Sequence, residues 1–189
     1  MSKTELFDFT TFPTLRTERL LLREMVATDA EDVFVFRSDP EVQKYNSEPL
    51  QEIAQAAAFI EQIRQWYADQ QEVIWGATLI GEDKVIGSFS LFDWQRYHNR
   101  AQIGYDLARR YWGQGIGSEA VRALLRFGFE RMKLHRIEAY TIIDNHASVR
   151  MLQKLGFQLE GVRRQYSWEE DGAYHGSGVF GLLRHEYGL

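Results

Sequence analysis

The chain has 189 residues, of which 44% are hydrophobic and 26% charged, and its formal net charge is −5 at pH 7. This composition favours one globular domain with a buried core, and the acidic balance argues against general nucleic-acid binding. With no cysteine, a disulfide scaffold, a thiolate metal site and a cysteine nucleophile are excluded. No apolar run approaches a membrane span. We therefore expect one domain over residues 1–189 (core about 15–187), a cytoplasmic location and no membrane or nucleic-acid partner.

The spacing of apolar residues in the first third predicts a strand and two helices. Residues 17–24 contain three consecutive leucines, which indicate a buried strand. A helix over 28–37 follows, because Asp29 can take part in its N-terminal cap and Pro40 prevents its extension. Over 50–70, apolar residues recur every three or four positions, which predicts a second helix.

The rest of the chain alternates strands and helices. Residues 72–80, 85–92 and 101–107 predict three strands, and the short turn after the first of them favours antiparallel pairing. The remaining predicted elements are a helix at 118–132, a strand at 137–143, a short helix at 147–155 and two strands at 157–168 and 173–183. The crossover through the first of these helices makes the strands on either side of it a parallel pair. The predicted fold class is mixed α/β, with a mostly antiparallel sheet.

A glycine-rich turn precedes the long helix of the second half. Gly113, Gly115 and Gly117 alternate there, and glycine permits unusual backbone angles and close approach of a ligand to the main chain. A helix N-terminus adds unpaired donors and a partial positive charge. The pattern indicates an anion site with Arg109 and Arg110 at its mouth, although a tight turn without a ligand has the same spacing. It matches neither a P-loop nor a Rossmann fingerprint.

These residues resemble the GCN5-related N-acetyltransferase (GNAT) superfamily. Its acyl-CoA signature, Gln/Arg-x-x-Gly-x-Gly/Ala, is met by Arg110, Gly113 and Gly115. The segments that resemble the branch of the ribosomal-protein (Rim-type) N-terminal acetyltransferases are 17–23, 39–42, 103–107, 112–115, 119–120 and 145–157. The resemblance implies a GNAT-like fold, in which the two parallel strands splay apart to form a V-shaped slot, with flanking helices.

The resemblance also implies an acyl-CoA-dependent N-acetyltransferase with acetyl-CoA as co-substrate and no metal. The pantetheine arm would lie along 106–108, and the amides of 110–118 would hold the pyrophosphate. The implied CoA-binding residues are Leu107, Ala108, Arg109, Arg110, Gly113, Gln114, Gly115, Ile116, Gly117, Ser118, Asn145 and Arg150. Asn145 also fits an ordinary helix N-cap, and Arg150 fits a solvated helix face.

Two groups carry the implied chemistry. The backbone N–H of Leu107 would polarise the thioester carbonyl, and Ser148 occupies the position of a serine proposed to protonate the CoA thiolate. A serine in the first turn of a helix can equally satisfy backbone donors. Because the chain has no cysteine, we expect the amine to attack acetyl-CoA directly.

The general base is left open by the sequence. Gln102 and Ser167 stand where relatives carry glutamate. Glu24, Asp93 and Glu169 are candidates by rough location only, and a water chain is the alternative, because an α-amine with a pKa of about 8 is partly neutral at pH 7.

The acceptor is the least constrained part of the prediction. The Rim-type resemblance favours the α-amino group of a protein or peptide, of the ribosomal-protein-alanine type. A small amine (a polyamine, amino acid or antibiotic) and a non-catalytic CoA-binding module stay open. Trp94 and Tyr97 lie in a polar loop and are expected to contact the acceptor. The five histidines show no metal-ligand spacing, so no metal is expected, and the chain is expected to be a monomer or homodimer.

Overall fold

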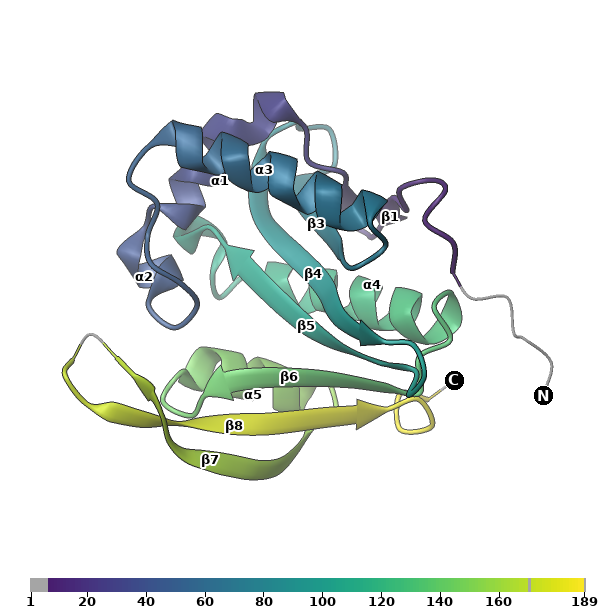
Figure 1. The fold of residues 1–189 in the computed structure, drawn as a ribbon, viewed down its shortest axis with the longest axis vertical. Coiled ribbons are helices and arrows are strands. Elements are labelled where there is room, and N and C mark those ends of the chain that lie inside the picture. The colour runs from purple at the N-terminus through teal and green to yellow at the C-terminus, as the bar shows by residue number, and fades with distance from the viewer. Residues whose placement is uncertain (1–6, 170, 189) are drawn as a thin grey trace.

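The computed structural model describes residues 7–169 and 171–188, which contain one eight-stranded sheet (Figure 1). The strands are β1 (Leu15–Arg16), β2 (Leu20–Arg23), β3 (Val73–Leu79), β4 (Val85–Gln95), β5 (Arg100–Leu107), β6 (Arg136–Ile142), β7 (Gln158–Trp168) and β8 (Tyr174–Leu183). Their order is β1-β2-β3-β4-β5-β6-β8-β7, and β5 and β6 form the parallel pair of an otherwise antiparallel sheet. The predicted fold class is confirmed.

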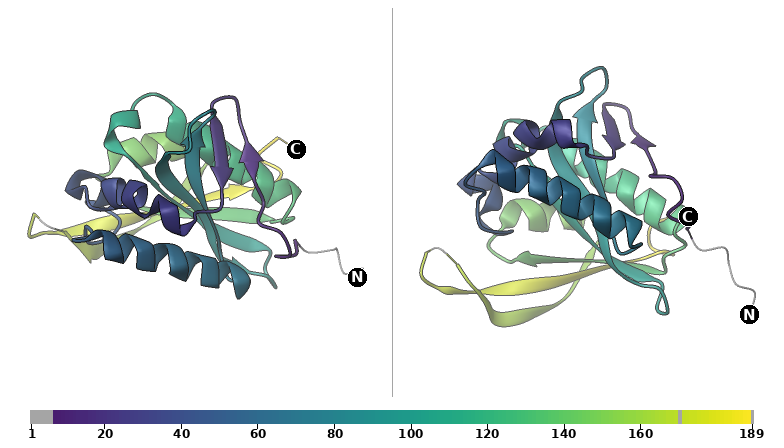
Figure 2. Two further views of the ribbon diagram at one scale, coloured as in Figure 1. Left: turned by 90° about the horizontal axis from the view of Figure 1, so that it is seen from above. Right: turned by 45° about the horizontal axis from the view of Figure 1, so that its top comes forward.

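Helices cover both faces of this sheet (Figure 2). They are α1 (Ala30–Arg37), α2 (Pro40–Gln43), α3 (Ile53–Ala68), α4 (Ile116–Glu130) and α5 (His146–Lys154), with short 3₁₀ turns at Ala27–Asp29 and Arg109–Tyr111. α1 and α3 lie on one face of the sheet and α4 lies on the other. The prediction missed β1 and α2. Asp39, next to the expected helix end, instead caps α2 by accepting the Glu41 N–H at 3.0 Å, and Pro40 is tolerated in the first turn.

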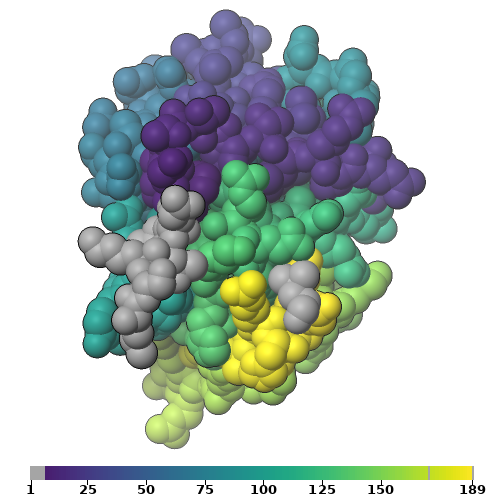
Figure 3. Space-filling model, turned by 90° about the vertical axis from the view of Figure 1, so that its right-hand side faces the viewer, coloured from purple at the N-terminus to yellow at the C-terminus, as the bar shows by residue number. Residues whose placement is uncertain are grey.

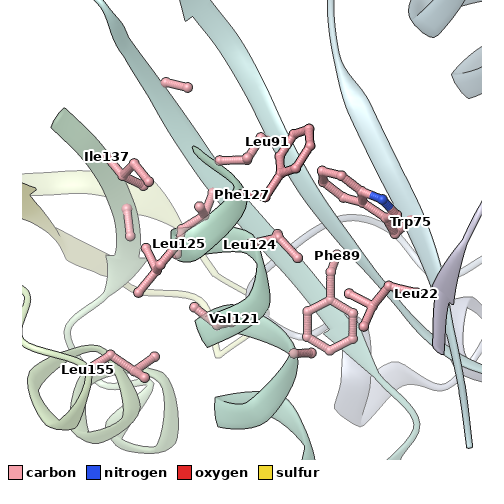
Figure 4. Close-up of a cluster of buried hydrophobic side chains, with 14 of the residues drawn as sticks. Leu22, Trp75, Phe89, Leu91, Val121, Leu124, Leu125, Phe127, Ile137 and Leu155 are labelled. Atoms are coloured by element: carbon pink, nitrogen blue, oxygen red, sulfur yellow. The ribbon is translucent and has the colours of Figure 1, made fainter. Parts of the chain in front are cut away.

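The main core lies between α4 and the sheet (Figure 4). Leu22, Trp75 and Phe89 contribute from three strands, and Val121 and Leu124 contribute from α4; each side chain is fully buried. α4 carries one polar stripe (Glu119, Arg122, Arg126 and Glu130) and is apolar or small on its other sides, which explains why it is buried against the sheet. The first described residues, from Phe7 on, lie beside α4 (Figure 3), where Phe7 makes an edge contact with Phe127 at 5.1 Å between ring centroids.

β5 and β6 diverge along their length, as the resemblance implied. They pair at only three positions, from Arg100↔Arg136 to Gln102↔Glu138, although β5 continues to Leu107. Beyond that point β5 stays paired with β4, whereas β6 stays paired with β8 through Ile142↔Ser177. At the C-terminal end of β5, the facing edges of β5 and β6 therefore do not pair with each other. Among the described residues, no helix combines the length and apolar character that crossing a bilayer requires.

We predict that Leu124→Ala lowers the free energy of unfolding by about 3 kcal/mol, because it leaves a cavity under α4. Urea denaturation monitored by circular dichroism measures this change. Tyr97→Ala is the matched control, since Tyr97 is 94% exposed and its loss should change stability by less than about 0.5 kcal/mol. Equal effects of the two substitutions would contradict the placement of the core.

Candidate functional site

A cleft with a volume of about 660 Å³ lies where β5 and β6 separate. One side is formed by α2 and the residues after it, and the floor comes from the second halves of β5 and β6. The glycine turn and α5 form the remaining wall. The expected site residues that line the cleft are Leu107, Gly113, Gly115, Gly117, Ser118, Asn145, Ser148 and Arg150.

The backbone of Leu107 presents a donor to the cleft. Hydrogen bonds from β5 to β4 alternate along an antiparallel ladder, and the N–H of Ala108 donates to Ile86 O at 2.8 Å. The N–H of Leu107 therefore points the other way, toward the edge from which β6 has diverged. The carbonyl of Leu107 accepts from Trp112 Nε1 at 2.7 Å. This leaves the N–H at that edge available to a polarised oxygen.

The glycine turn leaves the start of α4 open to an anion. Gly113 and Gly115 have φ values of 72° and 76°, which side chains rarely tolerate, and Gly115 is the N-cap of α4. No side chain caps this helix end, so its first amides lack the usual side-chain acceptor. Because Gly117 and Ser118 of this first turn also line the cleft, these donors fit a pyrophosphate.

Glu119 fixes the outer side of the turn. Its carboxylate accepts from Thr17 Oγ1 at 2.6 Å and from the Arg19 backbone N–H at 2.9 Å, and it pairs with Arg19 Nε at 2.7 Å. Arg19 Nη1 in turn donates to Gln114 O at 3.1 Å. Burial would raise the pKa of Glu119, but the hydrogen bonds from Thr17 and Arg19 outweigh it and lower that pKa. The β1–β2 turn thus anchors the start of α4.

α5 supplies the opposite end of the wall. Asn145 Oδ1 accepts the Ser148 N–H at 3.1 Å, which makes Asn145 the N-cap of this helix. Ser148 is buried, and its hydroxyl lies 2.7 Å from the hydroxyl of Tyr105 on β5. Arg150 and Lys154 line the same cleft and bring two positive charges to it.

The carboxylate of Asp106 organises the other face of β5. Its Oδ1 accepts from Asn46 Nδ2 at 2.6 Å and from Gln43 Nε2 at 3.3 Å. Its Oδ2 accepts from Arg37 Nη1 at 3.0 Å and from Ser88 Oγ at 3.4 Å. Four donors occupy the roughly four acceptor sites of a carboxylate. Asp106 therefore ties α1 and α2 to the strands, and no acceptor site is left for the proton of an amine.

We predict that Asp106→Ala lowers the free energy of unfolding by about 3 kcal/mol, because it leaves the largely buried charge of Arg37 without its partner. Urea denaturation tests this. Glu61→Ala, an exposed acid on α3, should cost less than about 0.5 kcal/mol. A loss below 1 kcal/mol for Asp106→Ala would show that Arg37 is hydrated in the folded protein.

Other expected residues lie away from the cleft. Tyr97 is in the exposed β4–β5 hairpin, and Trp94 packs on Phe9 with ring centroids 6.0 Å apart. Both are at the end of β5 that remains paired with β6, opposite the cleft, and neither residue lines it. A polar loop composition indicates exposure but does not say which end of a strand carries the site.

The remaining expected CoA contacts flank the cleft rather than line it. Ala108, Arg109 and Arg110 line a separate cavity of about 220 Å³, and Arg109 Nε pairs with Asp39 at 3.2 Å. Gln114 Nε2 donates to Arg110 O at 2.6 Å, and Ile116 is buried in the core. Their backbone groups belong to the turn, whereas their side chains point elsewhere.

The candidate bases are not at the cleft. Glu24 pairs with Arg64 at 3.0 Å, and Asp93 accepts from Gln102 at 2.7 Å near the hairpin. Neither these residues nor Glu169 lines the cleft. No group of three or more histidine or acidic side chains in the described part of the chain is arranged to hold a metal.

Two further features in or beside the cleft were missed by sequence analysis. Tyr140 lines the cleft and donates its hydroxyl to Glu138 Oε2 at 3.1 Å. His175 on β8 lies 2.5 Å from Asp144 and 2.8 Å from Asp171, so it connects the loop before α5 to the β7–β8 hairpin. These contacts join residues far apart in the chain, and no local pattern signals them.

We predict a pH-dependent stability from His175. Hydrogen bonds to Asp144 and then Asp171 raise its pKa above the ordinary 6.5. Because folding raises this pKa, the protonated imidazole stabilises the folded state. The contribution is complete below pH 6.5 and is lost as the pH rises through the folded-state pKa. The melting temperature of the wild type should therefore decline more over pH 6–8 than that of His175→Gln. His98→Gln, an exposed hairpin control, should keep the wild-type slope; a parallel decline in His175→Gln would contradict the assignment.

With this geometry established, comparison with known proteins gives the family. Residues 19–158 match the acetyltransferase (GNAT) domain family. The uncharacterized N-acetyltransferase p20 of Bacillus licheniformis is 40% identical over 177 residues, covering 92% of this chain and 98% of that protein. A GNAT-family acetyltransferase structure from Bacillus anthracis has a TM-score of 0.79 at 27% identity and covers 92% of this chain and 99% of that one.

A structure of the Rim-type branch shares the fold. The ribosomal alpha-N-protein acetyltransferase RimL, in complex with coenzyme A, has a TM-score of 0.82 at 19% identity, covering 90% of this chain and 98% of that one. The chain belongs to the GNAT acetyltransferase family, and the expected enzyme class, an N-acetyltransferase, is confirmed.

Proposed function

We propose that this protein transfers the acetyl group of acetyl-CoA to the α-amino group of a protein or peptide. The observation that carries the proposal is the cleft between diverging β5 and β6, with the uncapped start of α4 at one end and the Leu107 N–H facing it. Local donors of this kind bind an anionic ligand even in a chain with a net charge of −5.

Acetyl-CoA is a thioester and supplies the activated acetyl group. Different residues of the cleft bind different parts of it. The amides from Gly113 to Ser118 hold the pyrophosphate, and Arg150 adds charge at the same wall. Asn145 lies beside the pantetheine path while capping α5. The N–H of Leu107 stabilises the negative charge that develops on the carbonyl oxygen.

The chain's own groups suit direct transfer. An amide bond forms between the amine nitrogen and the acetyl carbon as the carbon–sulfur bond breaks. Ser148 gives its hydroxyl proton to the leaving sulfur. It regains a proton from the attacking nitrogen, which carries one proton too many for the amide product. Because hydrogen-bond donors occupy the acceptor sites of Asp106, water takes the first proton from the ammonium form of the amine.

A protein acceptor is supported by the surface next to the cleft. His175, which contacts the cleft residue Asp144, sits beside Trp168 and Tyr174, whose side chains are 62% and 61% exposed. Exposed aromatic groups of this kind are typical of protein-contact surfaces. RimL, described by its name as an alpha-N-protein acetyltransferase, shares the fold.

The acceptor is tested by measuring CoA release with a panel of substrates, followed by mass spectrometry of the products. The panel contains alanine-initiated and serine-initiated peptides, their N-terminally blocked forms, a polyamine, an amino acid and an aminoglycoside. We expect turnover on free-N-terminus peptides alone. Turnover confined to the small amines would overturn the acceptor assignment, and acetyl-CoA binding without turnover on any amine would favour a non-catalytic CoA-binding module.

We predict that Gly113→Val combined with Gly115→Val reduces acetyl-CoA affinity by at least 100-fold, an order-of-magnitude estimate for losing close approach to the turn amides. Calorimetry measures the dissociation constant. Gly81→Val is the matched control, because Gly81 also has a positive φ of 88° but lies in the β3–β4 turn. Intact binding in the double variant would refute the pyrophosphate site.

A further inference from the structure

We propose that Tyr105 is a positioning residue that orients the hydroxyl of Ser148 toward the leaving sulfur. This inference rests on the role proposed above for Ser148 and extends it to a second residue. The two hydroxyl oxygens lie 2.7 Å apart, Tyr105 on β5 and Ser148 on α5, and both residues line the cleft.

The hydrogen bonds around Ser148 leave one orientation useful for catalysis. Its backbone N–H is taken by Asn145 Oδ1, which fixes the first turn of α5. In the described structure, the hydrogen-bond partner of its Oγ is the Tyr105 hydroxyl, and either oxygen can be the donor in the resting state. If Ser148 donates to Tyr105, its proton is unavailable to sulfur. If Tyr105 donates to Ser148, the serine proton is free to point into the cleft.

The environment of Tyr105 keeps its hydroxyl protonated, so that it can donate to Ser148. Burial raises the pKa of Tyr105 to about 12, and this outweighs the hydrogen bond with Ser148, which lowers it. The phenol therefore keeps its proton at neutral pH. Phe89 lies beside the tyrosine ring, with ring centroids 6.4 Å apart, and limits its reorientation.

Tyr105 is not the terminal acid. The proton that Ser148 gives to the sulfur is replaced by the one that it takes from the nitrogen, so the transfer balances without the Tyr105 proton. Tyr105 acts through Ser148: it donates a hydrogen bond to Oγ while the serine proton moves to sulfur, and it retains its own proton throughout.

The arrangement follows from the alternation of side chains along β5. Tyr105 and Asp106 are neighbours, so their side chains point to opposite faces of the sheet. Tyr105 reaches α5 and the serine, whereas Asp106 reaches α1 and α2. Two neighbouring residues thus contact opposite walls of the cleft: Tyr105 contacts α5, and Asp106 contacts α1 and α2.

A double-mutant cycle tests the proposal. The variants are Tyr105→Phe, Ser148→Ala and the two combined, assayed with acetyl-CoA and an alanine-initiated peptide with a free α-amine. We expect Ser148→Ala to lower kcat by roughly 100-fold and Tyr105→Phe by roughly tenfold. The KM for acetyl-CoA should stay unchanged. In the Ser148→Ala background, Tyr105→Phe should change kcat by less than about twofold, because the residue it positions is gone.

Tyr67→Phe is the matched control. Burial also raises the pKa of Tyr67 to about 12, yet this residue packs between Phe9 and Phe12, away from the cleft. Its kcat should equal that of the wild type. Melting temperatures of all variants verify that each is folded, and retention of the tyrosine ring in Tyr105→Phe preserves its packing.

The outcomes separate the two claims. If Tyr105→Phe leaves kcat unchanged, or lowers it equally in both backgrounds, the positioning role of Tyr105 is overturned while that of Ser148 stands. If Ser148→Ala leaves kcat unchanged, the proposed role of Ser148 fails, and the inference about Tyr105 fails with it. Loss of the Tyr105→Phe effect only in the Ser148→Ala background supports the proposal.

Discussion

The site depends on the separation of β5 from β6. Backbone N–H and C=O groups at a strand edge normally find partners on the next strand. Here the pairing stops at Gln102↔Glu138, and β5 runs on to Leu107 beside an open cleft. The unpaired edge gives a ligand backbone donors that are rigidly held by the β4 ladder on the other side. A site built this way needs no flexible loop to present its central donor.

The divergence persists because each strand is held elsewhere. β4 pairs with β5 up to Gly87↔Leu107, and β8 pairs with β6 over its whole length. α4, which connects the two strands, packs its apolar faces into the core instead of bridging the gap. The sheet is therefore continuous in hydrogen bonding at one end and open at the other, which confines the cleft to a single place.

Two polar anchors keep the walls of this cleft in position. Glu119 ties the start of α4 to the β1–β2 turn, and Asp106 ties α1 and α2 to the strands. Both anchors connect segments distant in the chain through charge-assisted hydrogen bonds. The residues of α2 and those after it thus form one wall of the cleft, whereas the glycine turn and α5 form the other.

Local patterns determined most elements of this protein and located its glycine turn. The apolar spacing located α3 and α4, and the glycine alternation placed the turn at the start of α4, because periodicity and backbone freedom are properties of neighbouring residues. The motif residues from Ile103 to Leu107 and from Asn145 to Phe157 were sufficient to suggest the family.

Tertiary structure alone decided which side chains meet. The bond between Tyr105 and Ser148 spans 43 positions, and the one between Asn46 and Asp106 spans 60, so neither leaves a local signal. Trp94 and Tyr97 carry the composition of an exposed loop, but the direction of β4 and β5 puts them at the closed end of the sheet. Residue types in the chain set what chemistry is available, whereas the pairing of strands, which depends on contacts between distant segments, set where it is brought together.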